Sequence, residues 1–162
     1  MKIVTIGVYG FTEEDFFKTL ITAGVQVFCD IRWRRGVRGA DYAFVNHKRL
    51  QARLESMGIT YLHRRDLAPT PEIRQRQKDA DKIEKVAKRK RSTLSPGFIA
   101  AYQEDVLVNF DPRPFLEGLP KDAGVVALFC VEREPAACHR LLVAEVLSAA
   151  AGLEVEHLLP VI

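Results

Sequence analysis

Short apolar runs alternate with amphipathic segments in the first part of the chain. Three runs have the length and the mostly apolar content of strands that are covered on both faces: 2–8, 25–31 and 59–63. Two segments carry apolar residues at helical spacing: 12–23 and 46–57. Gly24 and Gly58 follow these segments and are typical helix ends. The β-α-β-α-β order predicts a parallel sheet with right-handed crossovers.

A charged, mainly helical insertion over residues 69–110 interrupts this order, and prolines bracket it. A solvated helix face explains most of its charges, although the insertion has the size to pack as a separate lobe. Residues 124–130 then form the clearest strand, a helix is expected to open near Pro135, and residues 153–158 form a fifth strand. We predict one α/β domain over residues 1–162. It has three layers, with a mainly parallel five-stranded sheet flanked by helices and the insertion between strands three and four.

The composition is that of a folded globular protein. Hydrophobic residues make up 48% of the 162 residues and charged residues 28%, which argues against a disordered chain. No apolar run approaches the roughly 20 residues of a membrane span, and the amino terminus leads straight into a strand pattern. We expect a cytoplasmic protein with no membrane partner. Three cysteines are too few for a secreted disulfide framework, and the oligomeric state stays open.

The net charge of +3 is unevenly distributed. Between Arg64 and Arg91 there are eleven basic residues and five acidic ones, an excess that favours an anionic partner. The run Lys88–Arg91, and the loop 32–39 with Trp33 among its arginines, also suit phosphate backbones and base stacking. Nucleic acid is therefore a candidate partner.

Reactive side chains gather where the predicted strands end. Asp30 and Arg32 follow the second strand, Arg64 follows the third, and Cys130 and Glu132 follow the fourth. In open parallel sheets, ligands bind outside the carboxyl ends of the strands. These side chains are therefore expected around one site.

The turn after the fourth strand has the features of an anion site. Pro135 in the first turn of a helix leaves the next amides without intrahelical partners, and the helix dipole favours a negative ligand there. Arg140 and Arg32 then complete a phosphate clamp, with Arg32 on the facing wall. Cys138 beside His139 is a candidate nucleophile or redox thiol.

Simpler interpretations stand beside these. Cys130 at the end of an apolar strand is more often a small buried side chain, and Asp30 with Arg32 is equally well a structural ion pair. No GxxxxGK[ST] or well-placed GxGxxG pattern occurs, so we expect no cofactor. A metal site from Cys130, Cys138 and His139 would have a spacing unlike common zinc motifs, so we assign no metal ligand.

Several motifs have a familiar combination: Thr5-Ile6-Gly7, Phe16 with Leu20, Cys29-Asp30-Ile31-Arg32 and Cys130-x-Glu132-x-x-Pro135-x-x-Cys138-His139-Arg140. In these the chain resembles the domain-of-unknown-function 488 (DUF 488) family over nearly its whole length, thinning over 69–96. The chain departs from the family at Trp33–Arg38, where a proline is usual, and at Leu67-Ala68-Pro69, where Leu-Gly-Gly is common. The family has no settled activity, so the resemblance implies a site and no reaction.

The leading hypothesis is an anion-binding site that binds or acts on a phosphorylated or nucleic-acid ligand. Its residues are Cys138, His139, Glu132 and Asp30 as the catalytic groups, with Arg32, Arg140, Cys130, Trp33 and Arg64 as ligand-binding groups. Whether the protein is an enzyme stays open; as one, it would be a hydrolase or transferase acting on a phosphate-containing substrate. The alternatives are a non-enzymatic nucleic-acid-binding module and a thiol redox or metal sensor.

Overall fold

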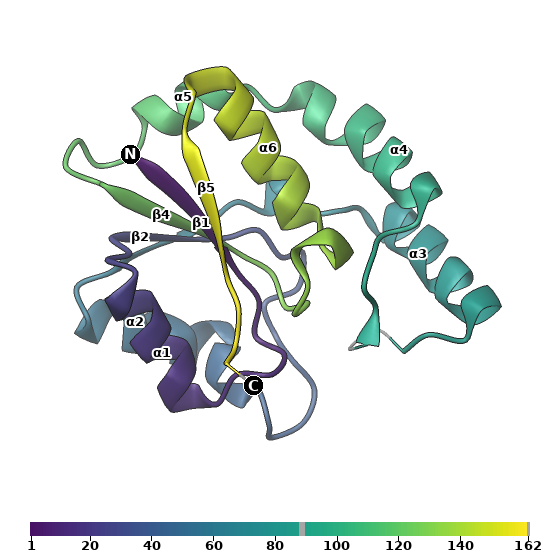
Figure 1. Ribbon diagram of the computed structural model, residues 1–162, viewed down its shortest axis with the longest axis horizontal. Helices are drawn as coiled ribbons and strands as arrows, with labels where there is room; N and C mark the ends of the chain where they lie inside the picture. Colours follow the sequence, from purple (N-terminus) through teal and green to yellow (C-terminus); the bar gives the residue numbers. More distant parts are fainter. Residues whose placement is uncertain (88–89, 162) are drawn as a thin grey trace.

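The computed structural model describes residues 1–87 and 90–161, which form a five-stranded sheet between two layers of helices (Figure 1). The strands are β1 (Lys2–Ile6), β2 (Val27–Asp30), β3 (Thr60–His63), β4 (Val125–Phe129) and β5 (Glu154–Leu158). Their order in the sheet is β3-β2-β4-β1-β5, and every pairing is parallel. The predicted α/β class is confirmed, with a sheet that is parallel throughout.

All but one of the described α-helices begin at a side-chain cap that the sequence supplies, and the exception is the helix that begins at His47. The helices are α1 (Glu13–Thr22), α2 (His47–Ser56), α3 (Pro71–Glu84), α4 (Pro96–Asp105), α5 (Pro112–Glu117) and α6 (His139–Ala151). Short 3₁₀ turns occur at η1 (Ala43–Val45), η2 (Arg65–Leu67), η4 (Leu107–Asn109) and η5 (Pro135–Ala137). The hydroxyls of Thr12, Thr70 and Ser95 each accept a hydrogen bond from the amide three residues on. Within the described ranges, no helix has the length and apolar content needed to cross a membrane.

Two apolar layers lie on opposite faces of the sheet. In the first, Phe16 of α1 packs edge-on against Phe11, which precedes the helix, and also contacts Phe28 and Phe129 of the strands. The second layer contains α4, α5 and α6. The strands β1, β2 and β4 are therefore covered on both faces, which explains their nearly continuous apolar sequences, whereas the edge strand β5 exposes Glu154 and Glu156.

The insertion is part of the second layer. Ile73 of α3 and Phe98 and Tyr102 of α4 are buried in the same cluster as Val126 and Leu128 of β4. The insertion therefore does not form the separate lobe considered from the sequence. The helix expected up to residue 110 is shorter, because α4 ends at Asp105 and a 3₁₀ turn follows.

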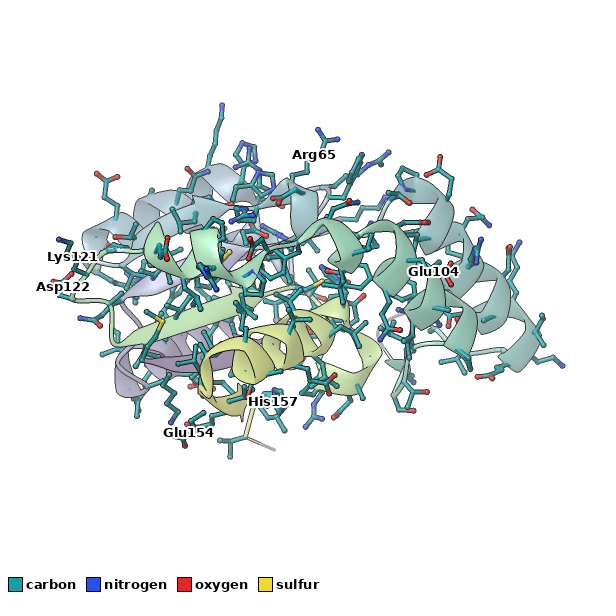
Figure 2. All side chains as sticks on the ribbon, turned by 90° about the horizontal axis from the view of Figure 1, so that it is seen from above. Arg65, Glu104, Lys121, Asp122, Glu154 and His157 are labelled. Atoms are coloured by element: carbon teal, nitrogen blue, oxygen red, sulfur yellow. The ribbon has the colours of Figure 1, made fainter. Side chains whose placement is uncertain are left out.

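The carboxyl end of β4 is a topological switch. The chain leaves β4 for α6 on one face, whereas it leaves the flanking strands β1 and β2 for α1 and α2 on the other (Figure 1). Such a divergence opens a crevice between neighbouring strands. The turn with Lys121 and Asp122, which precedes β4, lies at the opposite end of the molecule from α3 (Figure 2). The insertion helix α3 thus lies on the carboxyl-end side of the sheet.

Candidate functional site

A pocket of about 140 Å³ lies at this carboxyl end, and we call it the β4 pocket. Its floor contains Cys130, which directly follows β4, together with Cys138 and His139 at the beginning of α6. Its opposite wall comes from the insertion, with α3 and the segment that leads into α4. The floor and the wall are therefore distant in sequence and meet only in the fold.

The turn after β4 differs from the sequence expectation. Pro135 begins the short turn η5, and α6 begins only at His139. The amides of Ala137 and Cys138 already donate to the carbonyls of Glu134 and Pro135, at 3.0 and 3.1 Å. They are not free for an anion, so the predicted amide cradle is wrong. Cys138 instead caps α6, since its Sγ accepts from the amide of Arg140 at 3.5 Å.

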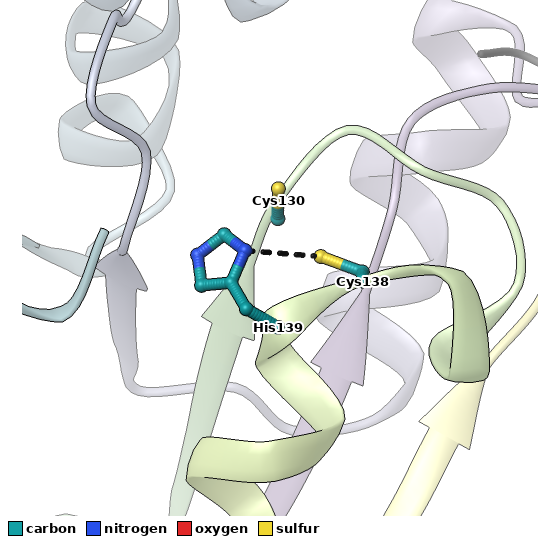
Figure 3. Close-up of side chains that lie close together, drawn as sticks. All are labelled: Cys130, Cys138 and His139. Carbon is teal, nitrogen blue, oxygen red and sulfur yellow. Dashed lines mark hydrogen bonds between the residues drawn. The ribbon is translucent and has the colours of Figure 1, made fainter. Parts of the chain in front are cut away.

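His139 is held in one orientation by a backbone carbonyl. Its Nε2 lies 2.8 Å from the carbonyl oxygen of Ile31, at the end of β2. A carbonyl only accepts, so Nε2 donates and the neutral ring carries its lone pair on Nδ1. That Nδ1 lies 3.6 Å from Sγ of Cys138, and Figure 3 shows the two side chains meeting beside Cys130. The edge of Tyr102 packs on the ring from α4, 5.5 Å between centroids.

Cys130 contacts a carboxylate inside the pocket. Its thiol donates to Oε2 of Glu132 at 3.1 Å. Burial raises the pKa of Cys130, contact with Cys138 raises it further, and His139 acts in the opposite direction. The third cysteine, Cys29, lies in the second core layer away from the pocket, and burial raises its pKa to about 12.

One face of α3 makes the opposite wall. The wall residues of this helix are spaced at i, i+3, i+4 and i+7: Arg74, Gln77, Lys78 and Asp81. Gln77 is buried, donates to Asp81 at 2.8 Å and accepts from the amide of Ser95 at 2.8 Å. This side of the helix is polar because it faces the pocket, although its sequence resembles that of a solvated face.

Arg91 and Leu94 connect this wall to the floor. Arg91 pairs with Asp81 at 2.9 Å, and its second nitrogen lies 3.8 Å from Glu132. The amide of Leu94 donates to the carbonyl of Ala136 in η5 at 2.9 Å. These contacts fix the insertion over the floor. Lys88 and Arg89 of the predicted basic run lie outside the described residues.

The pocket lining has more positive than negative side chains. Three cations, Arg74, Lys78 and Arg91, face two carboxylates, Asp81 and Glu132. The Nε atom of Arg74 is buried and has no hydrogen-bond partner among the described residues. The Nε atom of Arg91, on the same wall, is in the same state, and a buried donor without a partner costs free energy.

The predicted arginine clamp does not face the β4 pocket. Arg32 makes two hydrogen bonds to Asp30, at 2.9 and 2.8 Å, and another to the carbonyl of Val45 at 2.9 Å. Tyr61 also donates to this carboxylate, at 2.7 Å, and burial together with the neighbouring Asp30 raises the pKa of Tyr61. Asp30 and Arg32 are almost fully buried and order the loop after β2. Neither lines the pocket.

Arg140 also has a local partner set. Its guanidinium donates to the carbonyls of Glu132 and Arg133, at 2.6 and 3.0 Å, and is fully buried. The backbone of Gly7 packs on the same Glu132 carbonyl, so closely that a Cβ on residue 7 would lie 1.8 Å from the oxygen. The Thr-Ile-Gly motif and Arg140 therefore hold the loop that follows β4 from two sides.

The two remaining predicted residues lie on another part of the surface. Trp33 is half-buried, with the guanidinium of Arg65 stacked 4.0 Å from its ring centroid. Arg64 pairs with Asp66 at 2.8 Å and packs over the ring of Phe115. Neither Trp33 nor Arg64 lines the β4 pocket.

Of the nine residues assigned from the sequence, the β4 pocket brings together Cys130, Glu132, Cys138 and His139. Sequence reasoning missed the cations of α3, Arg74 and Lys78, and assigned Arg91 to a basic run for nucleic acid instead of to this pocket. The sequence feature that could have indicated the α3 wall is a set of polar residues at helical spacing around Gln77, an uncharged side chain in a highly charged helix.

The comparison with family models agrees with the architecture. A model described as a domain of unknown function, DUF488, matches residues 12–147, which is most of the chain, so the protein belongs to this family. The matched range contains the floor and the wall of the β4 pocket. No curated protein and no solved structure showed significant similarity to the chain.

Proposed function

We propose that this member of a family of unknown function binds a small ligand with a phosphate or similar anionic group in the β4 pocket. The observation that carries the proposal is the surplus of positive charge in the pocket lining, where Arg74, Lys78 and Arg91 face two carboxylates. An arginine is well suited to bind phosphate oxygens through parallel N–H groups.

The size of the pocket sets the class of ligand. A volume of about 140 Å³ admits a phosphoryl or carboxylate group with a few attached atoms, and no nucleic-acid duplex. The thiols, the imidazole and Glu132 on the floor then lie against the ligand. If the bound ligand reacts, the imidazole lone pair and the Glu132 carboxylate are the groups positioned to move a proton.

The test uses inorganic phosphate and titration calorimetry. Arg74→Gln removes one charge from the pocket wall, and Arg76→Gln is the matched control, because Arg76 is exposed on the same helix and does not line the pocket. We expect Arg74→Gln to weaken phosphate binding about tenfold or more, as loss of a charged hydrogen bond implies, and Arg76→Gln to leave it unchanged. Equal effects of the two substitutions would refute the proposal.

A second candidate function rests on Trp33. Its stack with Arg65 lies next to the arginines of the loop 32–39, a combination that suits single-stranded nucleic acid. On this reading, a fluorescent oligonucleotide binds with a steep salt dependence, and Trp33→Ala weakens binding while Arg74→Gln does not. Binding that is insensitive to Trp33→Ala would reject it.

A further inference from the structure

Cys130, Cys138 and His139 form a compact set of metal-ligand atoms on the floor of the β4 pocket. Their two sulfurs and one ring nitrogen all lie within 4.8 Å of one another, and all three residues are buried (Figure 3). They come from two elements, because Cys130 follows β4 whereas the other two begin α6. Their spacing in the sequence differs from common zinc motifs, which explains why the sequence pattern did not predict a metal site.

The imidazole is already arranged to bind an ion. The hydrogen bond from Nε2 to the carbonyl of Ile31 leaves the lone pair on Nδ1, the atom that faces Cys138. Histidines that bind metals nearly always donate their other N–H to a carbonyl or carboxylate in this way. The packing of Tyr102 on the ring holds it in the same orientation.

The sulfur of Cys138 also has an outer contact of the expected kind. The amide of Arg140 donates to Sγ of Cys138 at the amino end of α6, where the helix dipole favours negative charge on the sulfur. The thiol of Cys130 donates to the carboxylate of Glu132, and this hydrogen bond is given up when the thiol loses its proton to an ion. His139 and Cys138 are therefore each oriented by a second group outside the set.

The distances match a tetrahedral ion. With Zn–S bonds of about 2.3 Å and Zn–N bonds of about 2.0–2.1 Å, tetrahedral angles place sulfur and nitrogen about 3.6 Å apart and two sulfurs about 3.8 Å apart. The separation of Cys138 Sγ and His139 Nδ1 is 3.6 Å. Because no pair of ligand atoms is more than 4.8 Å apart, closing the set around an ion requires a movement of about 1 Å.

We propose that Cys130, Cys138 and His139 bind one Zn²⁺ ion through Sγ, Sγ and Nδ1. Thiolate and imidazole ligands together select this ion over harder cations such as Mg²⁺. Each thiol gives its proton to solvent as it binds, so the ion and its two thiolates are neutral together. Three protein ligands leave a fourth position, and the β4 pocket is the space next to it.

The inference rests on the proposed function in one respect, namely that the fourth position opens into the anion pocket. Glu132 also lines this pocket. A water or a ligand oxygen on the ion is therefore placed near a carboxylate that can accept a proton, with the cations of α3 across the pocket. This arrangement is that of open, reactive zinc sites, whereas structural zinc sites have four protein ligands.

The experiment measures metal uptake by the reduced full-length protein. Competition with a chromophoric chelator gives the Zn²⁺ affinity and stoichiometry, and Co²⁺ in place of Zn²⁺ gives a sulfur-to-metal charge-transfer band. We expect one ion per chain, with the band present in wild type and in Cys29→Ser, whose thiol lies in the other core layer. Cys138→Ser should weaken the band, since only the Cys130 sulfur remains, and weaken Zn²⁺ binding by more than about 100-fold, since loss of an outer contact alone costs 10–100-fold.

The wild-type measurement tests the zinc site even if a variant fails to fold. Circular dichroism of each metal-free variant identifies such a failure. Absence of the charge-transfer band in wild type, or equal Zn²⁺ affinity in Cys138→Ser and wild type, would overturn the zinc site. Phosphate binding is measured separately on chelator-treated protein. Phosphate binding that depends on Arg74 without Zn²⁺ uptake rejects the zinc site alone, and Zn²⁺ uptake without such phosphate binding rejects the anion pocket alone.

Discussion

Two arginine–aspartate pairs in this protein have nearly the same geometry and very different burial. Arg32 and Asp30 make two parallel hydrogen bonds of 2.9 and 2.8 Å, and Arg64 and Asp66 make two of 2.8 Å. The first pair is 2% and 0% exposed, whereas the second is 32% and 60% exposed. Water therefore replaces a lost partner in the second pair and does not reach the first.

We predict that Asp30→Asn lowers the free energy of unfolding by about 3–5 kcal/mol, the cost of leaving a buried charge without its counter-ion. The carboxylate has four donors, two from the Arg32 side chain, the Arg32 amide and the hydroxyl of Tyr61. An asparagine side chain replaces one of the two accepting oxygens with an NH₂ group, which then faces hydrogen-bond donors and cannot accept from them. Asp66→Asn, the geometric match, should cost less than about 1 kcal/mol.

Urea denaturation followed by circular dichroism measures both variants. With a slope near 2 kcal/mol/M, the midpoint of Asp30→Asn should fall by roughly 1.5–2.5 M, and that of Asp66→Asn by less than about 0.5 M. Equal shifts would show that burial does not govern these pairs. A loss of phosphate binding in Asp30→Asn at unchanged stability would return Asp30 to the catalytic role predicted from the sequence.

Two further predictions concern the same end of the sheet. Gly7→Ala should lower the free energy of unfolding in thermal melts by about 1–3 kcal/mol, because its Cβ would meet the Glu132 carbonyl. Gly97→Ala is the control and should not lower it, because nothing lies within 4 Å of the added Cβ. Similar melting temperatures for the two variants would refute this prediction. Burial and then Arg140 lower the pKa of His157 below 6.5, so the folded protein binds this proton less readily than the unfolded chain. The contribution of His157 to the free energy of unfolding should be fully present above about pH 6.5 and be lost as the pH falls below that value. The loss should be smaller in His157→Gln. A His157 titration midpoint at or above 6.5 by NMR would contradict the predicted direction of the pKa shift.

The sequence predicted the layers of the fold because its strands and helices differ in period. Apolar runs such as 25–31 and amphipathic segments such as 12–23 each favour one element, and the side-chain caps set where helices begin. The position of β4 between β1 and β2 could not be predicted, because no local sequence pattern indicates which strands pair. The beginning of α6 was also misplaced, because proline favours the first turn of a 3₁₀ helix as well as that of an α-helix.

The site was predicted in part, and the division has a physical reason. Cys130 and Cys138 could be located because they stand where a strand ends and a helix begins. Arg32 and Arg140 were interpreted as clamps because charge in a sequence suggests a polar ligand, whereas their partners are backbone carbonyls and an aspartate that the fold supplies. Arg74 was missed because a charged helix face that lines a pocket has the same composition as one in water.

The floor and the wall of the β4 pocket come from different segments of the chain. The floor belongs to the sheet and α6, and the Arg140 bonds and the Gly7 contact hold it without help from α3. The wall belongs to α3 together with Arg91 and Leu94, and the Leu94 amide ties it to η5. Exchanging the wall for another helical segment would therefore change which molecule is admitted while the reactive floor stays as it is. Ligand choice and chemistry are thus encoded in two different segments of one small fold.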